Sequence, residues 1–98
     1  MDRATVAAKL RACEPELKAA GIVRLSLFGS VARGSASARS DVDLMAEFDP
    51  GRQFSLLDMV RIENRLADIL GVPVDLAPAR ATKEHIRERA MQEAVIAF

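Results

Sequence analysis

Two aspartates separated by one residue, Asp41 and Asp43, form the pair in this sequence with the clearest chemical potential. On a β-strand, such a pair projects from one face, with the carboxylates about 7 Å apart along the chain. Like charges this close raise each other's pKa unless a cation lies between them. Mg²⁺ suits this position, because it is a hard cation that binds carboxylate oxygens together with water and phosphate. A third acid, Asp75, would let a second metal share the site.

A second feature, Gly29-Ser30, directly follows the alternating stretch 23–28. Backbone N–H groups and a hydroxyl at a strand end that turns into a helix favour phosphate. Glycine also lets a ligand approach the backbone without a Cβ in the way. Arg33, one turn further on, could reach the same anion. Taken singly, Asp-x-Asp is more often solvated surface and Gly-Ser more often a simple turn, so the predicted magnesium and phosphate site rests on their combination.

The residues around the aspartates predict the strand that positions them. Residues 41–48 alternate with a period of two, which is typical of a strand with one buried face. The apolar face has Val42, Leu44, Ala46 and Phe48, and the polar face has Asp41, Asp43 and Glu47. From the sequence alone, it stays open whether Glu47 joins the site or points to solvent.

The N-terminal part of the chain predicts a helix followed by a strand. Apolar residues at helical spacing indicate a helix over residues 2–20, interrupted near Pro15 and ended at Gly21. A strand over residues 23–28 follows, because Val23, Leu25 and Leu27 alternate with Arg24 and Ser26. Residues 33–40, rich in Gly, Ser and Ala, are expected to form a loop.

A second helix is predicted after a turn at residues 49–51. Ser55 with Asp58 resembles a capping pair that opens this helix, and Gly71 occupies the usual position just past its end. Its buried stripe is expected to contain Leu56, Met59, Ile62, Leu66 and Ile69.

The last third of the chain predicts a short strand, Val74-Asp75-Leu76, and a last helix capped by Thr82. This element order, helix, strand, strand, helix, strand, helix, predicts an α+β fold (an α/β sandwich) with a small mixed sheet flanked by helices. The end of the last helix is apolar over more than one face, which makes it a candidate interface with another protein. Its apolar residues are Ala90, Met91, Ala94, Val95, Ala97 and Phe98.

Size and composition restrict the class of protein. A length of 98 residues allows one domain, residues 1–98, with one core. Acidic and basic residues balance at fourteen each, which argues against direct nucleic-acid binding through phosphate neutralisation. The single Cys13 and the single His85 do not support a zinc site. No segment has the length or apolarity of a signal peptide or a membrane span, so a cytoplasmic protein is expected.

The string LFGSVARGSASARSDVDL resembles the minimal nucleotidyltransferase (MNT) branch of the DNA polymerase β-like nucleotidyltransferase superfamily. The family pattern is Gly-Ser-x-Ala-Arg-Gly followed by Ser-Asp-x-Asp-Leu. It matches this chain, without a mismatch, at Gly29, Ser30, Ala32, Arg33, Gly34, Ser40, Asp41, Asp43 and Leu44. Asp75 then follows about thirty residues later between two apolar residues. The resemblance covers almost the whole chain.

This resemblance implies a reaction and a role for each site residue. The carboxylates of Asp41 and Asp43 are expected to hold two Mg²⁺ ions and, through them, ATP. Asp75 would complete one metal site and help to deprotonate the acceptor hydroxyl, while Ser30 and the Gly29 backbone would contact phosphate. The hydroxyl would then attack the α-phosphorus, and pyrophosphate would leave.

The resemblance also implies a partner. MNT proteins are typically encoded beside a HEPN-domain toxin, and the MNT member is an antitoxin that adenylylates a tyrosine of the toxin. A hetero-oligomer with such a toxin is therefore expected. Two alternatives stay open: a catalytically silent antitoxin that only binds its partner, and a subunit of a small-molecule (aminoglycoside-type) nucleotidyltransferase. The sequence identifies neither the base preference nor the acceptor nor the stoichiometry.

Overall fold

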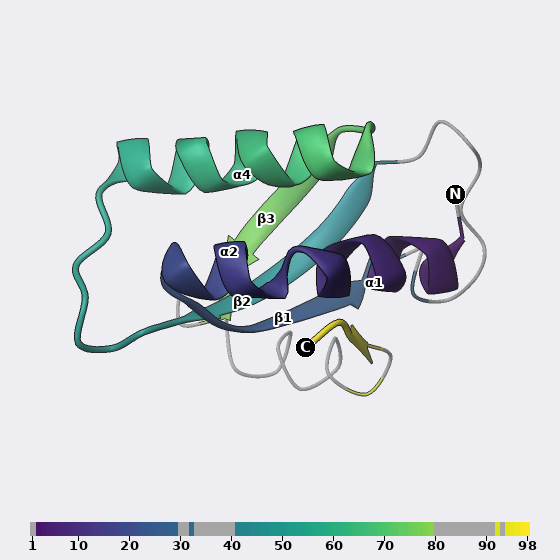
Figure 1. Cartoon of the computed structure of the whole chain (residues 1–98), viewed down its shortest axis with the longest axis horizontal. Coiled ribbons are helices and arrows are strands. Elements are labelled where there is room, and N and C mark those ends of the chain that lie inside the picture. The colour runs from purple at the N-terminus through teal and green to yellow at the C-terminus, as the bar shows by residue number, and fades with distance from the viewer. Residues whose placement is uncertain (1, 30–31, 33–40, 80–91, 93) are drawn as a thin grey trace.

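The computed structural model describes residues 2–29, 32, 41–79, 92 and 94–98, which form helices packed on a four-stranded sheet (Figure 1). The helices are α1 (Arg3–Ala12), α2 (Glu14–Ala19) and α4 (Leu56–Leu70). The strands are β1 (Ile22–Phe28), β2 (Val42–Phe48), β3 (Val74–Pro78) and β4 (Val95–Ile96). In the strand order β3-β2-β1-β4, β1 is antiparallel to both of its neighbours and β2 is parallel to β3. This mixed sheet confirms the predicted α+β class.

The N-terminal helix is interrupted where the sequence predicted. Asp2 caps α1, since its carboxylate accepts a hydrogen bond of 2.8 Å from the backbone N–H of Thr5. Cys13 separates α1 from α2, and Pro15 lies in the first turn of α2, where its missing N–H costs little. The two short helices therefore pack as one continuous layer with a slight break.

Local signals also set the limits of α4. Ser55 and Asp58 form a reciprocal capping box at its start, and Gly71 ends it in the left-handed conformation with a φ of 74°. Ile62, Leu66 and Leu70 are its buried residues. The predicted stripe was wrong at Leu56, whose side chain is 82% exposed because it lies at the very first position of the helix.

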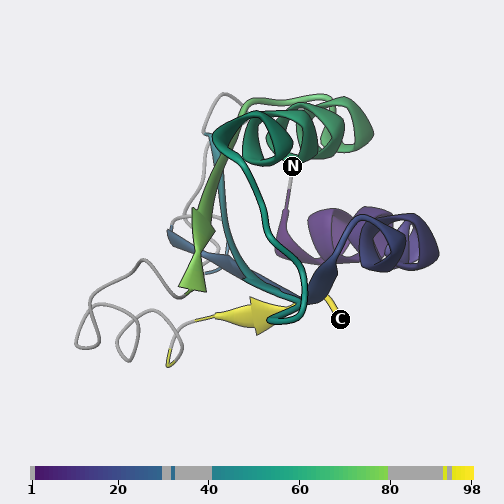
Figure 2. The ribbon, with the colours of Figure 1, turned by 90° about the vertical axis from the view of Figure 1, so that its left-hand side faces the viewer.

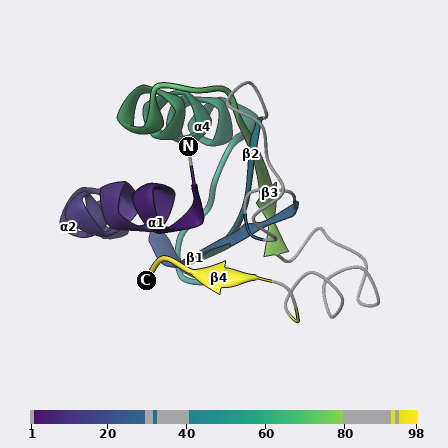
Figure 3. The same cartoon turned by 90° about the vertical axis from the view of Figure 1, so that its right-hand side faces the viewer.

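The three helices lie together on one face of the sheet, as the two side views show (Figure 2, Figure 3). The core fills the space between these layers and is built from aliphatic side chains: Val6, Leu10, Leu17, Ile22, Leu25, Leu27, Val42, Leu44, Leu66 and Leu70. At the start of β1, an irregularity between Ile22 and Arg24 makes Ile22 the inward residue and leaves Val23 53% exposed. None of the helices in the described part of the chain is long and apolar enough to cross a membrane.

The C-terminus differs from the prediction. Val95 and Ile96 form β4, which pairs antiparallel with β1, so the predicted helix does not continue to the end of the chain. Both residues are β-branched and suit a strand, and the free edge of β1 supplies the pairing partner. Ala97 is buried and Phe98 packs against the domain's own core. The predicted interface therefore loses Val95, Ala97 and Phe98, while Thr82, His85, Ala90 and Met91 lie outside the described residues.

Candidate active site

Asp43 and Asp75 lie side by side on neighbouring parallel strands. They are direct register partners in the β2–β3 pair, whose strands are about 4.8 Å apart. Because register partners point to the same face of a sheet, both carboxylates project from the face opposite Val42 and Leu44. Asp41 is exposed and lies just before the first residue of β2. All three aspartates therefore belong to the same end of the sheet.

Gly29 directly follows β1 and lies at the same end of the sheet as the aspartates. A Cβ atom at position 29 would collide with the Asp43 carboxylate and lie only 3.2 Å from its Cγ. The backbone at Gly29 also has a φ of 73°, a conformation that residues with a side chain rarely adopt. The sequence predicted a glycine that lets a ligand approach the backbone, and the structure adds that this backbone already packs against one of the three carboxylates.

Ala32, three residues after Gly29, has a buried side chain that belongs to the same core cluster as Val6 and Ala7 of α1. Ser30 and Arg33 lie outside the described residues, so their phosphate contacts stay predictions.

Phe28 is a neighbour of the site to which the sequence analysis gave no role. It is half-buried and lies directly opposite Asp43 in the β1–β2 pair, on the same face of the sheet. The alternation of β1 carried a signal for this position, since Phe28 falls on the same side as Ser26. The register with Asp43, however, depends on a pairing between distant residues.

Glu47 shares the face of Asp43 but lies four residues further along β2, which corresponds to about 13 Å. It is exposed, and its carboxylate forms an ion pair of 3.7 Å with the Nε atom of Arg24 on β1. Glu47 therefore belongs to the opposite end of the strand and has its own cationic partner. This position answers the question that the sequence left open.

The donor chemistry at this end of the sheet fits Mg²⁺. Asp43 and Asp75 supply hard oxygen ligands from adjacent strands, and Gly29 has no side chain that would cover them. In the part of the chain that the structure describes, no three Asp, Glu, His or Cys side chains lie grouped so that they could hold a metal ion together, so the fit to Mg²⁺ rests on the pair Asp43 and Asp75. Asp41 and Asp75 are exposed, so they can turn towards a cation at small cost.

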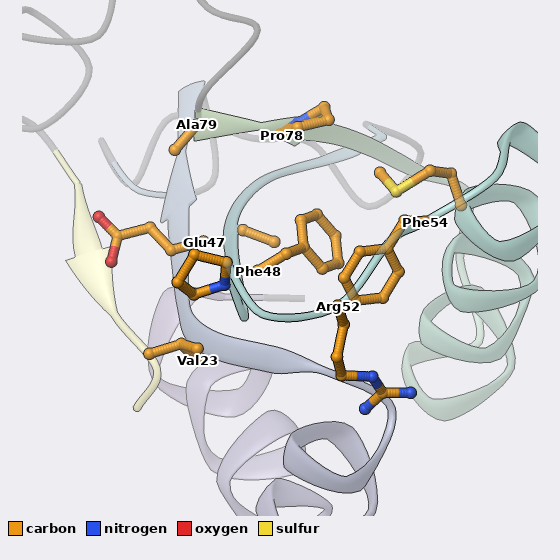
Figure 4. Close-up of a pocket in the computed structure, with 10 residues that line it drawn as sticks. Val23, Glu47, Phe48, Arg52, Phe54, Pro78 and Ala79 are labelled. Carbon is orange, nitrogen blue, oxygen red and sulfur yellow. The ribbon is translucent and has the colours of Figure 1, made fainter.

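A separate cavity of about 540 Å³ lies at the other end of the strands (Figure 4). Its floor contains Phe48 and Phe54, whose ring centroids are 4.7 Å apart, and the Arg52 guanidinium lies 5.6 Å from the Phe54 ring. Ala46 and Pro78 line the same cavity, three residues beyond Asp43 and Asp75 on their strands. The three aspartates do not line it, so this cavity is distinct from the site that the sequence predicted.

Comparison with known proteins places the chain in a family. A profile described as the nucleotidyltransferase domain matches residues 10–97. A protein of Methanocaldococcus jannaschii, provisionally named a protein adenylyltransferase, is 38% identical over 81 residues, which cover 83% of this chain and 85% of the relative. The protein adenylyltransferase MntA of Thermococcus cleftensis is 35% identical over 75 residues, or 76% of this chain and 74% of the relative.

Solved structures share the same architecture. One, described as a provisionally assigned minimal nucleotidyltransferase, has a TM-score of 0.74 and 40% identity, and the match covers 97% of this chain and 95% of that one. A complex of the tri-AMPylated Shewanella oneidensis HEPN toxin with its MNT antitoxin has a TM-score of 0.60 and 15% identity, with 90% and 71% of the chains covered. The second likeness shows the fold alone.

Proposed function

This chain belongs to the nucleotidyltransferase domain family, and we propose that it transfers AMP from ATP to a tyrosine hydroxyl of a HEPN-domain toxin and so acts as its antitoxin. The observation that carries the proposal is the row formed by Asp43 and Asp75, with the bare backbone of Gly29 against Asp43. Such a row offers two carboxylates to Mg²⁺ and an open approach for phosphate, which are the two requirements of nucleotidyl transfer.

The three aspartates, Gly29 and Ser30 each have a role in this proposal. Asp41, Asp43 and Asp75 would hold two Mg²⁺ ions, which would supply positive charge to the triphosphate. The Gly29 backbone and Ser30 would orient the phosphates. Asp75 would accept the proton of the attacking hydroxyl. The new bond joins the acceptor oxygen to the α-phosphorus, the bond to the β-phosphate oxygen breaks, and pyrophosphate leaves with the electron pair.

The position of Asp75 supports a protein acceptor. β3 is the outermost strand on its side of the described sheet, and Asp75 is exposed there. Within the described sheet no strand lies beyond β3, so a side chain of a second protein can approach Asp75 from this edge. The names of the relatives, which describe protein adenylyltransferases, support the same choice, as does the AMPylated HEPN toxin bound to a protein of this fold.

The test is a transfer assay with the protein encoded next to this chain as the acceptor. The two proteins are purified together and incubated with Mg²⁺ and with ATP labelled at either the α- or the γ-phosphate. We expect label on the partner from the α-position only, and we expect Asp43→Asn to abolish it. Glu47→Gln is the matched control, because it removes the same charge from the same strand and face outside the site.

Three results would overturn the proposal. A partner that stays unlabelled while it is still inhibited by binding would indicate a silent antitoxin. Label in a small molecule, with every protein unlabelled, would indicate a small-molecule nucleotidyltransferase. Label from the γ-position would indicate a kinase-type reaction.

A further inference from the structure

Phe28, Asp43 and Asp75 form one row across three neighbouring strands. Phe28 is the register partner of Asp43 in the antiparallel β1–β2 pair, and Asp43 is the register partner of Asp75 in the parallel β2–β3 pair. Since register partners point to the same face of a sheet, the phenyl ring shares its face with the two carboxylates. Phe28 is about 4.8 Å, one strand spacing, from Asp43 and two spacings from Asp75.

The packing of Phe28 differs from that of the other phenylalanines. Phe48, Phe54 and Phe98 pack against the hydrophobic core, whereas Phe28 is not among the residues that do so. Leu27, the residue before it, is buried in the core, so the alternation of β1 turns Phe28 to the other face. Within the described sheet, the pairing of β1 with β4 ends at Leu27, one residue short of Phe28. Core packing therefore does not explain this half-buried ring.

The chemistry of a phenyl ring restricts what Phe28 can do beside two carboxylates. The ring has no charge and no hydrogen-bonding group, so it can neither bind Mg²⁺ nor hold a phosphate. It can offer an apolar face on which a nucleobase or the C–H groups of a ribose can pack. A nucleoside triphosphate needs both kinds of contact, and the row supplies them next to each other.

The order of the row favours the nucleoside over the acceptor as the group that packs on Phe28. Asp75 lies on the outermost strand on its side of the described sheet, where the proposed function places the acceptor. Phe28 lies on the other side of Asp43 and directly precedes Gly29, whose backbone lies against the Asp43 carboxylate. The ring therefore borders the side of the site where the triphosphate is expected.

We propose that Phe28 is a nucleotide-binding residue, on whose ring the nucleoside of ATP packs while Asp43 and Gly29 receive the triphosphate. This inference rests on the proposed function, because it assumes that the triphosphate lies at these two residues. The ring contributes affinity without choosing between bases, since stacking uses the face of a base and not its hydrogen-bonding edge. Any base preference must come from other groups.

Phe54 provides a matched control at the other end of the strands. It is also half-buried, but its ring lies against that of Phe48, with centroids 4.7 Å apart, in the cavity that the aspartates do not line. Because Phe54 packs against the core and Phe28 does not, Phe54→Leu should cost more stability than Phe28→Leu. The two variants therefore separate a loss of stability from a loss of nucleotide binding.

The experiment measures three dissociation constants by calorimetry on the full chain: for MgATP, for MgGTP and for magnesium tripolyphosphate, which has three phosphates but no nucleoside. For Phe28→Ala we expect MgATP and MgGTP each to bind about tenfold more weakly, a factor within the range for one base on one aromatic ring. Tripolyphosphate should bind as in the wild type. Phe28→Leu should show the same pattern with a smaller loss.

For Phe54→Leu we expect a lower melting temperature with all three dissociation constants unchanged. The inference is overturned if Phe28→Ala binds MgATP as tightly as the wild type, or if it loses tripolyphosphate by the same factor as MgATP. An unchanged MgATP affinity together with a higher KM for the partner protein would assign the ring to the acceptor and also overturn it.

Failure of the proposed function gives a different result. A wild-type chain that binds MgATP but leaves the partner protein unmodified would remove that function, and the dissociation constants of the Phe28 variants would still decide whether the ring binds the nucleoside. A wild-type chain that binds no MgATP would overturn both proposals.

Discussion

Gly29 and Asp43, which are fourteen positions apart in the chain, are in contact at the end of the sheet, and the contact leaves no room for a side chain on Gly29. Asp43 in turn faces Asp75 across the β2–β3 pair. The Gly29 backbone, the Asp43 carboxylate and the exposed Asp75 are therefore neighbours in this order at one end of the sheet. Mutation of each of these three residues should have a different effect.

Gly29→Ala should abolish nucleotidyl transfer. The added methyl group would displace the Asp43 carboxylate, and the positive φ would add strain of about 1–2 kcal/mol. Gly71→Ala is the control, since Gly71 has nearly the same φ, 74°, with nothing within 4 Å of a Cβ there. We expect similar losses in the free energy of unfolding from the φ strain, with loss of activity only for Gly29→Ala. Equal activities in the two variants would contradict the role of this contact.

Asp75→Asn should reduce turnover more than nucleotide affinity. Asp41 and Asp43 would still hold the metal-bound triphosphate, whereas the acceptor hydroxyl would lose its base, which is worth about 10²–10⁴-fold in rate. The measurement is kcat for AMP transfer together with the Kd for MgATP. A collapse of affinity with turnover per bound nucleotide unchanged would show that the role assigned to Asp75 is wrong.

Magnesium together with ATP should raise the melting temperature of the wild-type chain, because a ligand that binds only the folded state stabilises it. Asp43→Asn should lose this increase while the protein stays folded, since Asp43 lies on the face of β2 away from the helices and its replacement opens no cavity. Glu47→Gln should keep the increase. A magnesium-dependent shift of wild-type size in Asp43→Asn would exclude Asp43 as a ligand.

The acid stability of α4 should depend on Asp58. The hydrogen bond from the Ser55 backbone, followed by that from its side chain, lowers the pKa of Asp58 from its ordinary value of 3.8. A carboxylate with a lowered pKa contributes stability above 3.8, and this contribution is lost as the pH falls through the lower, folded-state pKa. Asp58→Asn should therefore narrow the difference between the melting temperatures at neutral pH and at acid pH.

The control for this prediction is Asp68→Asn, which removes an exposed carboxylate from the same helix outside the capping box. Its melting temperature should decrease towards low pH as steeply as that of the wild type. If Asp58→Asn and Asp68→Asn gave the same profile, the capping box would have no measurable part in acid stability.

The parts of the fold that the sequence predicted well depend on local chemistry. The start and end of α4 follow from Ser55, Asp58 and Gly71, which act within a few residues of themselves. The break at Pro15 and the face of Asp43 on β2 follow from similarly local rules. The hydrophobic pattern and the helix caps are sufficient to predict the local structure wherever the partner of a residue is close in the sequence.

The errors arose where distant residues decide the outcome. Val95 and Ile96 extend a helical pattern, yet they form a strand because the edge of β1 is available to them. Val23 fits an alternating strand, but the irregularity at the start of β1 turns it outward. In the same way, the hydrogen bond that the Arg3 guanidinium donates to the carbonyl of Ala32 has no local signal, since it requires the folded position of α1.

The most direct test of the central claim is the intact mass of the partner protein after incubation with this chain, Mg²⁺ and ATP. If Asp43 and its neighbours form a nucleotidyl-transfer site, the partner gains one or more AMP units with the wild-type chain and with Glu47→Gln, and gains none with Asp43→Asn. Equal AMP addition by Asp43→Asn and the wild type, or a partner of unchanged mass with both, would contradict the account.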